Sequence, residues 1–240
     1  MLLSEGADPN KTRSILPELP ILEESPLTYA VYECNVNIVR LLIENGGKVN
    51  DKINITGMNS YPASTALQKC DNEALFNLLI KNGAKVTDRD ICYIAATKDP
   101  ALLSRFVSQY KDVRKSLIHC ASLGGNISTL KWLRDNKFNL TDFDTEGNTA
   151  IHYLAGHNRW PIILDSTNVL IQTQDKFIYA LKFLMEHKLD INQQNNNGDT
   201  PLHVAAARHS PYIVEALLRY GAKVNVTNKK TVFLFILQCI

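Results

Sequence analysis

The sequence predicts an all-α solenoid, in which helix-turn-helix units stack side by side and short hairpin loops join them. Three observations predict it. A motif recurs along most of the chain, and the copy that starts at Ser25 repeats the offset from Thr200 to its turn glycine, Gly221. Within the copies, apolar residues recur at the spacing of a helix with one buried face. A turn residue, usually glycine, closes most copies, so each unit reads as two helices and a turn.

Residues 197–206, NGDTPLHVAA, form the clearest start of a unit. Thr200 can cap the exposed amides of the first turn, and Pro201 at the first helical position loses no hydrogen bond. Small alanines on this helix let an antiparallel helix approach closely. The second helix, predicted at 211–220, carries an apolar stripe, and Gly221 ends it in a left-handed turn that glycine adopts at little cost. The stripe consists of Ile213, Val214, Leu217 and Leu218.

This unit resembles an ankyrin repeat, whose signature runs GxTPLHxAA, then IVxxLL, then GAxVN. The resemblance implies pairs of antiparallel helices, and one pair cannot bury its apolar faces without neighbours. Weaker copies cover almost the whole chain, although the copy at 90–110 is degenerate and lacks the glycine turn. We expect a single domain, 1–240, with repeats at about 1–10 (partial), 22–50, 62–87, 88–112, 113–142, 145–193 (with an insertion at 157–176), 195–226 and 228–240 (partial, or an aberrant cap).

The insertion at 157–176 falls between the two helices of one repeat and contains an apolar run at 160–164. One interpretation is that it folds back over the convex side or extends a helix. The other is a protrusion that contacts a partner, because insertions in solenoids tend to lie in loops on one face. The connection between Asn50 and Ser64 is also longer than the hairpin of the family.

Both ends of the predicted array are irregular. The sequence starts inside the second helix of a repeat, and residues 231–237 are unusually apolar for the exposed cap of a repeat array. This apolar segment is either a cap that packs on the last repeat or a dimer contact, or the chain is a piece of a longer protein. We expect a piece of a longer protein.

The composition is that of an ordinary globular protein, with 45% hydrophobic residues, 21% charged residues and a net charge of +2. These values argue against disorder and give no support for nucleic-acid binding. No apolar stretch reaches the ~20 residues that span a bilayer, and the amino end lacks the pattern of a secretory signal. We expect a soluble protein in the cytoplasm, or in the host cytosol if it is a secreted effector.

The cysteines are odd in number, form no CxxC pair and lie mostly in apolar segments. We expect reduced thiols that pack as small hydrophobic side chains. The five are Cys34, Cys70, Cys92, Cys120 and Cys239.

His119, His152 and His203 occupy the same position in three copies, so the solenoid spreads them along its length and does not gather them into one site. In the family this histidine hydrogen-bonds to the turns between repeats. The sequence contains no glycine-rich phosphate loop, no set of ligands at zinc spacing and no local signature of a catalytic nucleophile. We therefore expect that the protein is not an enzyme and binds no cofactor or metal.

In ankyrin proteins, the hairpin tips and the outward face of each first helix form a concave groove that binds a partner protein. We expect the equivalent positions here to have no role in stacking, so that they can vary to fit a partner. Tyr32, Trp160 and Arg208 belong to the residue types that most often dominate binding energy. The candidate partner-binding residues are Glu24, Tyr32, Glu33, Lys115, Leu123, Thr145, Glu146, Asn148, His157, Trp160, Asn196, Asn197, Asp199 and Arg208.

The sequence thus predicts a monomeric scaffold that binds another protein, of unknown identity, without nucleic acid and without a membrane span. The alternative is a targeting or substrate-recognition segment of a larger enzyme, ligase adaptor or host-directed effector, whose active part lies outside this chain.

Overall fold

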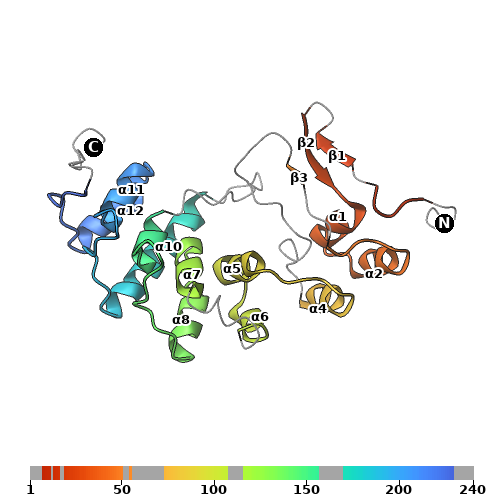
Figure 1. Cartoon of the computed structure of the whole chain (residues 1–240), viewed down its shortest axis with the longest axis horizontal. Helices are drawn as coiled ribbons and strands as arrows, with labels where there is room; N and C mark the ends of the chain where they lie inside the picture. The colour runs from red at the N-terminus through yellow and green to blue at the C-terminus, as the bar shows by residue number, and fades with distance from the viewer. Residues whose placement is uncertain are drawn as a thin grey trace. The chain divides into compact units, whose positions relative to one another are not determined.

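The computed structural model describes residues 7–11, 13–16, 19–50, 54–55, 73–107, 116–156 and 170–229 of the chain (Figure 1). These residues belong to two compact units, Met1–Asp90 and Ile91–Ile240. The expected solenoid of helix pairs is confirmed. The expectation of one continuous domain stays a prediction.

The first unit combines helices with a small antiparallel sheet. Its three strands have the order β1-β2-β3, and β2 pairs on both sides. Helix α1 packs on α2, and α2 packs on α4. The sequence did not predict the sheet, whose third strand lies in the long connection after Asn50. The elements are β1 Arg13–Leu16, β2 Leu19–Glu24, α1 Pro26–Tyr32, α2 Val36–Glu44, β3 Asn54–Ile55 and α4 Glu73–Lys81.

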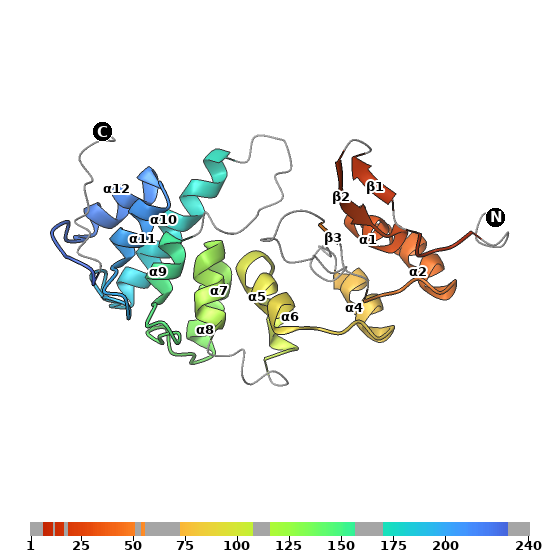
Figure 2. The same ribbon diagram turned by 45° about the horizontal axis from the view of Figure 1, so that its top comes forward.

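The second unit is a stack of helix pairs (Figure 2). The first helices α7, α9 and α11 pack side by side, and among the second helices α10 packs against both α8 and α12. Helix α5 contains the boundary between the two units. The elements are α5 Asp88–Thr97, α6 Pro100–Ser104, α7 Leu117–Gly124, α8 Ile127–Asp135, α9 Ala150–Ala155, α10 Leu170–Glu186, α11 Pro201–Ala207 and α12 Pro211–Arg219.

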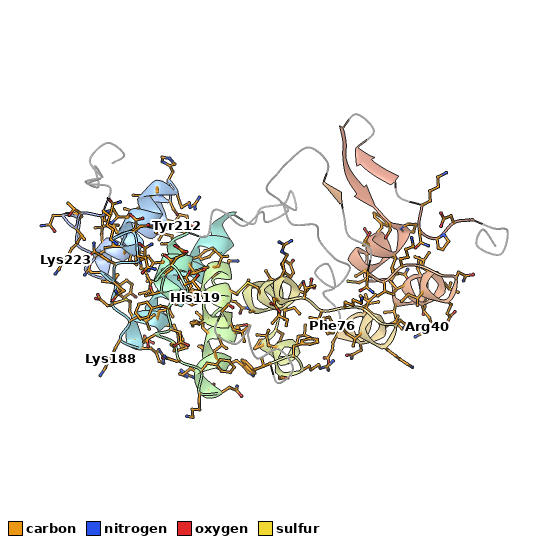
Figure 3. The ribbon with its side chains drawn as sticks, in the orientation of Figure 1. Arg40, Phe76, His119, Lys188, Tyr212 and Lys223 are labelled. Carbon is orange, nitrogen blue, oxygen red and sulfur yellow. A yellow bond between two sulfur atoms is a disulfide. The ribbon has the colours of Figure 1, made fainter. Side chains whose placement is uncertain are left out.

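The helices begin where the sequence supplies a cap. The Oδ1 atoms of Asn35 and Asn126 accept hydrogen bonds from backbone N–H groups in the first turns of α2 and α8. Proline occupies the first turn of α1, α6, α11 and α12, where its missing N–H costs nothing. The second helices then bury apolar side chains; Phe76 of α4, for example, is 2% exposed (Figure 3).

A left-handed residue follows each of the long second helices, whether or not it is glycine. Gly46, Gly83 and Gly221 have φ between 84° and 90°. Lys137 and Lys188 occupy the same place with φ 62°, a conformation that costs a residue with a side chain about 1–2 kcal/mol. The glycine signature is therefore lost from the sequence at these two turns, while the turn geometry is retained.

The degenerate copy at 90–110 is a helix pair, α5 and α6, within its described residues. Its cap lies three residues earlier than the sequence analysis placed the start of the copy. Thr87 donates its backbone N–H and its hydroxyl to Asp90 Oδ2, at 2.8 and 2.6 Å. Asp90 thereby accepts the backbone N–H three residues before it, as His152 does in a regular repeat. Because an aspartate replaces the histidine, this copy does not match the histidine of the repeat motif.

The insertion is partly helical. Helix α10 begins at Leu170, inside the predicted insertion at 157–176, and extends for 17 residues. This part of the insertion therefore extends a helix, in agreement with the first interpretation. Residues 157–169 lie outside the described part of the chain.

Helices α5 and α7 approach each other closely. A Cβ atom added at Gly124 would lie 2.0 Å from the carbonyl oxygen of Ala96, so only glycine fits there. Next to this contact, Asn126 Nδ2 donates to the carbonyl oxygens of Ala95 and Lys98, at 3.1 and 2.8 Å. The asparagine that caps α8 thus also satisfies carbonyls at the end of α5.

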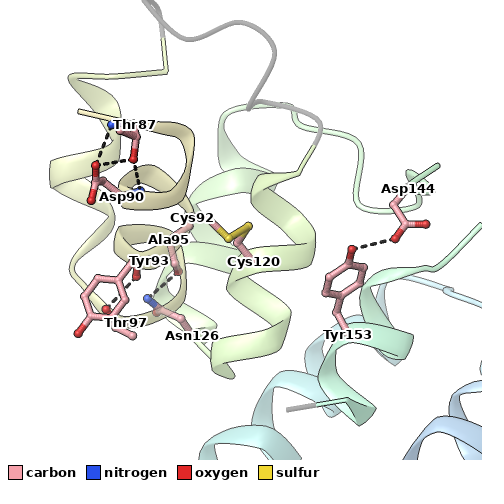
Figure 4. The surroundings of a disulfide bond; sticks show 10 residues. All are labelled: Thr87, Asp90, Cys92, Tyr93, Ala95, Thr97, Cys120, Asn126, Asp144 and Tyr153. Atoms are coloured by element: carbon pink, nitrogen blue, oxygen red, sulfur yellow. Dashed lines mark hydrogen bonds between the residues drawn. A yellow bond between two sulfur atoms is a disulfide. The ribbon is translucent and has the colours of Figure 1, made fainter. Parts of the chain in front are cut away.

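The same close approach places two cysteines in bonding distance. Cys92 of α5 and Cys120 of α7 form a disulfide, with their Cα atoms 5.2 Å apart (Figure 4). The expectation of reduced thiols is therefore wrong for this pair, because adjacent repeats bring together residues that are 28 positions apart. Cys34 is free but exposed, so it is not packed as a hydrophobic residue either. Cys70 and Cys239 lie outside the described residues.

The contact at Gly124 gives a first prediction. The Gly124→Ala substitution should lower the free energy of unfolding of the second unit by about 1–3 kcal/mol, because backbone must move to admit the methyl group. Urea denaturation followed by circular dichroism measures the loss. Gly156→Ala is the matched control, since its new Cβ would meet nothing closer than 3.4 Å. Equal stabilities for the two variants would contradict the prediction.

The disulfide gives a second prediction. Alkylation of the urea-unfolded chain without reductant should leave Cys92 and Cys120 unmodified, and reductant should raise the number of modified thiols by these two. Closing the 28-residue loop should stabilise the fold by about 3–4 kcal/mol in the chain-entropy estimate, and reductant should remove that contribution. Intact mass spectrometry counts the modified thiols. Cys92→Ser should show no such response to reductant, whereas the control Cys34→Ser should respond as the wild type does.

Candidate functional site

The hairpin loops between repeats are short and internally closed. In the loop before α9, the backbone N–H of Asp144 donates to the carbonyl of Asn148 at 3.1 Å. In the loop before α11, the N–H of Asn195 donates to the carbonyl of Asp199 at 2.9 Å. Gly198 turns the second loop with φ 77°, in the left-handed region that favours glycine. Both loops therefore present a defined tip.

Adjacent tips are hydrogen-bonded to one another. The backbone N–H of Asn196 donates to the carbonyl of Glu146 at 2.9 Å, and its Nδ2 donates to the carbonyl of Thr145 at 3.1 Å. One repeat further on, the N–H of Lys229 donates to the carbonyl of Asn197 at 3.0 Å. We call the tips at 144–148, 195–199 and 227–229, with these bonds, the tip ladder.

Side chains strengthen the tip ladder. Asn195 Nδ2 donates to Asn148 Oδ1 at 2.8 Å, and Asn228 Nδ2 donates to Asp199 Oδ1 at 2.6 Å. Within the first tip, Asn148 also donates its backbone N–H and its Nδ2 to the carboxylate of Asp144. The tip ladder thus includes hydrogen bonds between the amide and carboxylate side chains of neighbouring tips, in addition to its backbone bonds.

Buried histidines join the first helices α7 and α9 to the hairpin that follows each of them. His152 Nδ1 accepts from the backbone N–H of Thr149 at 3.1 Å, so the ring proton of the neutral imidazole lies on Nε2. Nε2 then donates across the repeat boundary to the carbonyl of Asp199 at 2.9 Å. His119 makes the equivalent kind of bond to the carbonyl of Asp142, at 3.1 Å. Burial lowers the pKa of both imidazoles below the ordinary histidine value, which keeps them neutral.

Tyr153 and Asp144 extend this network to the tip ladder (Figure 4). Tyr153 Oη donates to Asp144 Oδ2 at 2.8 Å, and its ring lies 4.8 Å from that of His119. Burial raises the pKa of Tyr153, and the hydrogen bond to the carboxylate raises it further. Burial alone would raise the pKa of Asp144, but hydrogen bonds from Asn148, Tyr153 and Glu146 hold it below its ordinary value. Asp144 is therefore a charged acceptor that orders its hairpin.

The structure places nine of the fourteen candidate partner-binding residues with their side chains. Exposed at or near helix ends and tips are Glu33, Thr145, Glu146, Asn196 and Asn197, and partly buried are Leu123, Asn148, Asp199 and Arg208. For Glu24 and Tyr32 the structure describes the backbone, at the ends of β2 and α1. Lys115, His157 and Trp160 lie outside the described residues.

The expectation that these positions have no role in stacking is wrong for three of them. The side chains of Asn148, Asn196 and Asp199 all form hydrogen bonds between neighbouring tips. Their amide and carboxylate groups fit the loops so well because short polar side chains readily hydrogen-bond to nearby backbone. Whether any of the fourteen binds a partner stays a prediction.

The sequence analysis missed a second series of bridges. Asn50 Oδ1 accepts the N–H of Lys85 at 2.7 Å, and its Nδ2 donates to the carbonyl of Gly83 at 3.1 Å. Asn10 bridges to Gly46 and Lys48 in the same way, and Asn192 bridges to Gly221 and Lys223. These bridges could have been predicted from the asparagine that ends the GAxVN part of the motif. In each case that asparagine hydrogen-bonds to the corresponding turn of the next repeat.

Among the residues that the structure describes, no helix is long and apolar enough to cross a membrane. The same residues contain no cluster of three or more histidine, cysteine or carboxylate side chains arranged to hold a metal ion.

Stacked helix pairs, joined by buried histidines and a tip ladder, define a helical repeat protein. Two family models identify the repeat. One, ankyrin repeats (3 copies), matches residues 1–90 and 165–228, and another, ankyrin repeats (many copies), matches residues 118–171. These matches cover more than half of the chain, which therefore belongs to the ankyrin repeat family. Ankyrin repeats are in general protein–protein interaction modules and typically not catalytic.

Relatives with curated names agree with this assignment. An ankyrin repeat protein of Acanthamoeba polyphaga mimivirus is 23% identical over 91% of this chain and 26% of its own length. A second protein of the same virus is 30% identical over 53% of this chain and 23% of its own length. A palmitoyltransferase of Lachancea kluyveri is 30% identical over 50% of this chain and 19% of its own length. The chain thus spans about a quarter or less of these relatives.

The histidine bridges give a third prediction. Because the folded-state pKa of His119 and His152 is lowered, the unfolded chain binds more protons once the pH falls below about 6.5. Their contribution to stability is complete above that pH and is lost as the pH falls. The free energy of unfolding of the second unit should therefore decrease from about pH 7.5 to about pH 5.5, above the range in which carboxylates titrate.

Urea titrations at several pH values test this. His152→Gln should be less stable at neutral pH but should lose less stability on acidification than the wild type does. His209→Asn, at an exposed position, is the control and should keep the wild-type slope. An unchanged slope in His152→Gln would contradict the assignment of a neutral, bridging imidazole.

Proposed function

We propose that this chain is a protein-binding module that presents the tip ladder and the outward face of its first helices to a partner protein. The observation that carries the proposal is the contrast within the tips. Backbone and several amide groups are fixed by bonds between repeats, while the side chains of Thr145, Glu146 and Asn197 are exposed at the ends of the loops.

A fixed backbone supports binding because little conformational freedom remains to be lost when a partner docks. The exposed side chains can change without disturbing the ladder, since Thr145, Glu146 and Asn197 contribute backbone carbonyls to it. The tips thus combine a main-chain geometry that hydrogen bonds fix with free choice of the exposed side chains, which suits a recognition surface.

The other candidate residues extend the proposed surface along the chain. Arg208 lies at the end of α11, Leu123 near the end of α7 and Glu33 at the end of α1. Glu24, Tyr32, Lys115, His157 and Trp160 complete the set that we propose for the partner. We further propose a monomeric, cytoplasmic scaffold without catalytic activity of its own.

The second candidate function is a targeting or substrate-recognition segment of a larger enzyme, ligase adaptor or host-directed effector. The short share of each relative that the chain spans favours it, and one relative carries the name of a transferase. An antibody raised against this chain discriminates the two candidates. In its native source, a band near 27.0 kDa supports the separate module, and a much larger band supports the segment.

Partner binding gives a fourth prediction. Affinity capture with the wild-type chain should identify a protein whose dissociation constant is then measured by biolayer interferometry. Truncation of the tips in Thr145→Ala/Glu146→Ala/Asn197→Ala should weaken that binding by about tenfold or more, as losses at a contact surface do. Circular dichroism should show an unchanged fold, because the backbone bonds remain.

The control is Lys182→Ala/Glu186→Ala, which removes two exposed side chains of α10, a second helix. It should bind as the wild type does. Equal affinity of the tip variant and the wild type would place the binding surface elsewhere, and weaker binding by the α10 variant alone would place it on the second helices.

A further inference from the structure

Helix α5 is attached to the next repeat at two places, one in each half of the helix. In its first half, Cys92 forms the disulfide with Cys120 of α7 (Figure 4). In its second half, the backbone of Ala96 lies against Gly124 of α7, where a Cβ atom would not fit. The covalent and the non-covalent attachment of this helix are therefore separated along its length.

The attachment of the second half does not depend on the disulfide. Asn126 Nδ2 donates to the carbonyls of Ala95 and Lys98, at 3.1 and 2.8 Å. Helix α6, which follows α5 in the chain, packs on α8. Breaking the disulfide leaves these contacts in place, so it releases the first half of α5 and leaves the second half packed on its neighbours.

The cap of α5 remains within the helix. The hydrogen bonds from Thr87 to Asp90 join residues at the beginning of α5 to one another, so they persist when this part of the helix separates from α7. Cys92 is the second residue of the second unit, which begins at Ile91. The disulfide therefore ties the beginning of this unit to the repeat that follows it.

The two cysteines differ in their access to solvent. Cys92 is partly exposed, whereas Cys120 is 6% exposed. Thiol–disulfide exchange starts when a thiolate attacks one sulfur of the disulfide, and access helps to decide which sulfur is attacked. A reductant therefore reaches the Cys92 Sγ atom first.

We propose that the Cys92–Cys120 disulfide is a reversible redox site, reduced by a dithiol, that couples the first half of α5 to α7. One thiolate of the dithiol bonds to Cys92 Sγ and displaces Cys120 as a thiolate, which takes up a proton. The second thiol of the reductant then attacks its own partner sulfur in the mixed disulfide and releases Cys92, which is protonated in turn. The dithiol thus loses two electrons and two protons and becomes a disulfide, and the two cysteines gain them.

The reaction is reversible because the second half of α5 keeps the two thiols close. The contacts at Gly124 and Asn126 hold the neighbouring repeats together, so each thiol remains at a high effective concentration near the other. Exchange with a small disulfide can then restore the bond in the folded chain. The redox state sets the mobility of one end of α5, while α7 to α12 stay folded.

NMR relaxation of the full-length, ¹⁵N-labelled chain tests the coupling. The other three cysteines are first replaced, in Cys34→Ser/Cys70→Ser/Cys239→Ser, so that only the disulfide pair can react. Dithiothreitol should lower the backbone order parameters of the first half of α5 from the rigid value, about 0.85, to below about 0.6. Those of α9, α11 and α12 should not change. Exchange of dithiothreitol for oxidised glutathione should restore the initial values.

Cys92→Ser/Cys120→Ser, made in the same background, should show the low order parameters with and without dithiothreitol. The background chain with its disulfide intact is the matched control. The proposal is overturned if the order parameters of α5 are the same in both redox states. It is also overturned if those of α9, α11 and α12 fall on reduction, because the bond would then support the whole unit.

The site of attack is tested with a thioredoxin whose resolving cysteine is replaced by serine. This variant cannot complete the second step, so the mixed disulfide accumulates. Peptide mapping by mass spectrometry should find the trapped thioredoxin on Cys92. A bond to Cys120, or no trapped species at all in the folded chain, would overturn the proposed reaction.

Discussion

A neutral imidazole held between two repeats is the interaction on which the second unit depends. In His152 one ring nitrogen accepts from the cap of its own helix, and the other donates to the carbonyl of Asp199 in the next hairpin. A single side chain therefore fixes where a helix begins and where the following repeat lies. Protonation would remove the acceptor, and a residue without two distinct ring nitrogens could not make both bonds. The start of α9 and the position of the following hairpin thus both depend on the imidazole tautomer that carries its proton on Nε2.

The bonds between repeats are arranged in three separate rows. His119 and His152 join α7 and α9 to the following hairpins, and amide groups join the tips. The asparagines Asn10, Asn50 and Asn192 hydrogen-bond to the turns after the second helices. Within the rows each bond joins neighbours, so the stack can lose a bond at one repeat and retain the rest. The pair α5–α6 illustrates this, because Asp90 keeps the helix cap although it is not histidine. There the disulfide and the contact at Gly124 tie α5 to α7 instead.

The sequence predicted the helix pairs well because the determinants of a repeat are local. Thr200, Pro201 and Gly221 act within a few residues of their own position, and the same letters recur wherever the geometry recurs. The prediction was weaker where two distant residues had to meet. Cys92 and Cys120 carry no motif, β3 pairs with β2 across a long connection, and the hydrogen bonds of Asn196 go to the preceding hairpin, about 50 residues earlier in the chain. The sequence therefore predicted which residues lie at the hairpin tips. It did not predict the hydrogen bonds that their polar groups make between tips.

The join between α9 and α10 shows where such an array can acquire new sequence. The described bonds between repeats join hairpin tips, first helices and the turns after second helices, so none of these bonds fixes the length of chain between the two helices of a repeat. A longer flexible connection adds only about 0.6 kcal/mol of closure entropy for each doubling of its length. By contrast, a residue added to a hairpin tip would move Asn195 or Asp199 away from their partners. The connection between the two helices of a repeat therefore tolerates inserted residues, in evolution or in an engineered loop graft. The hairpin tip does not.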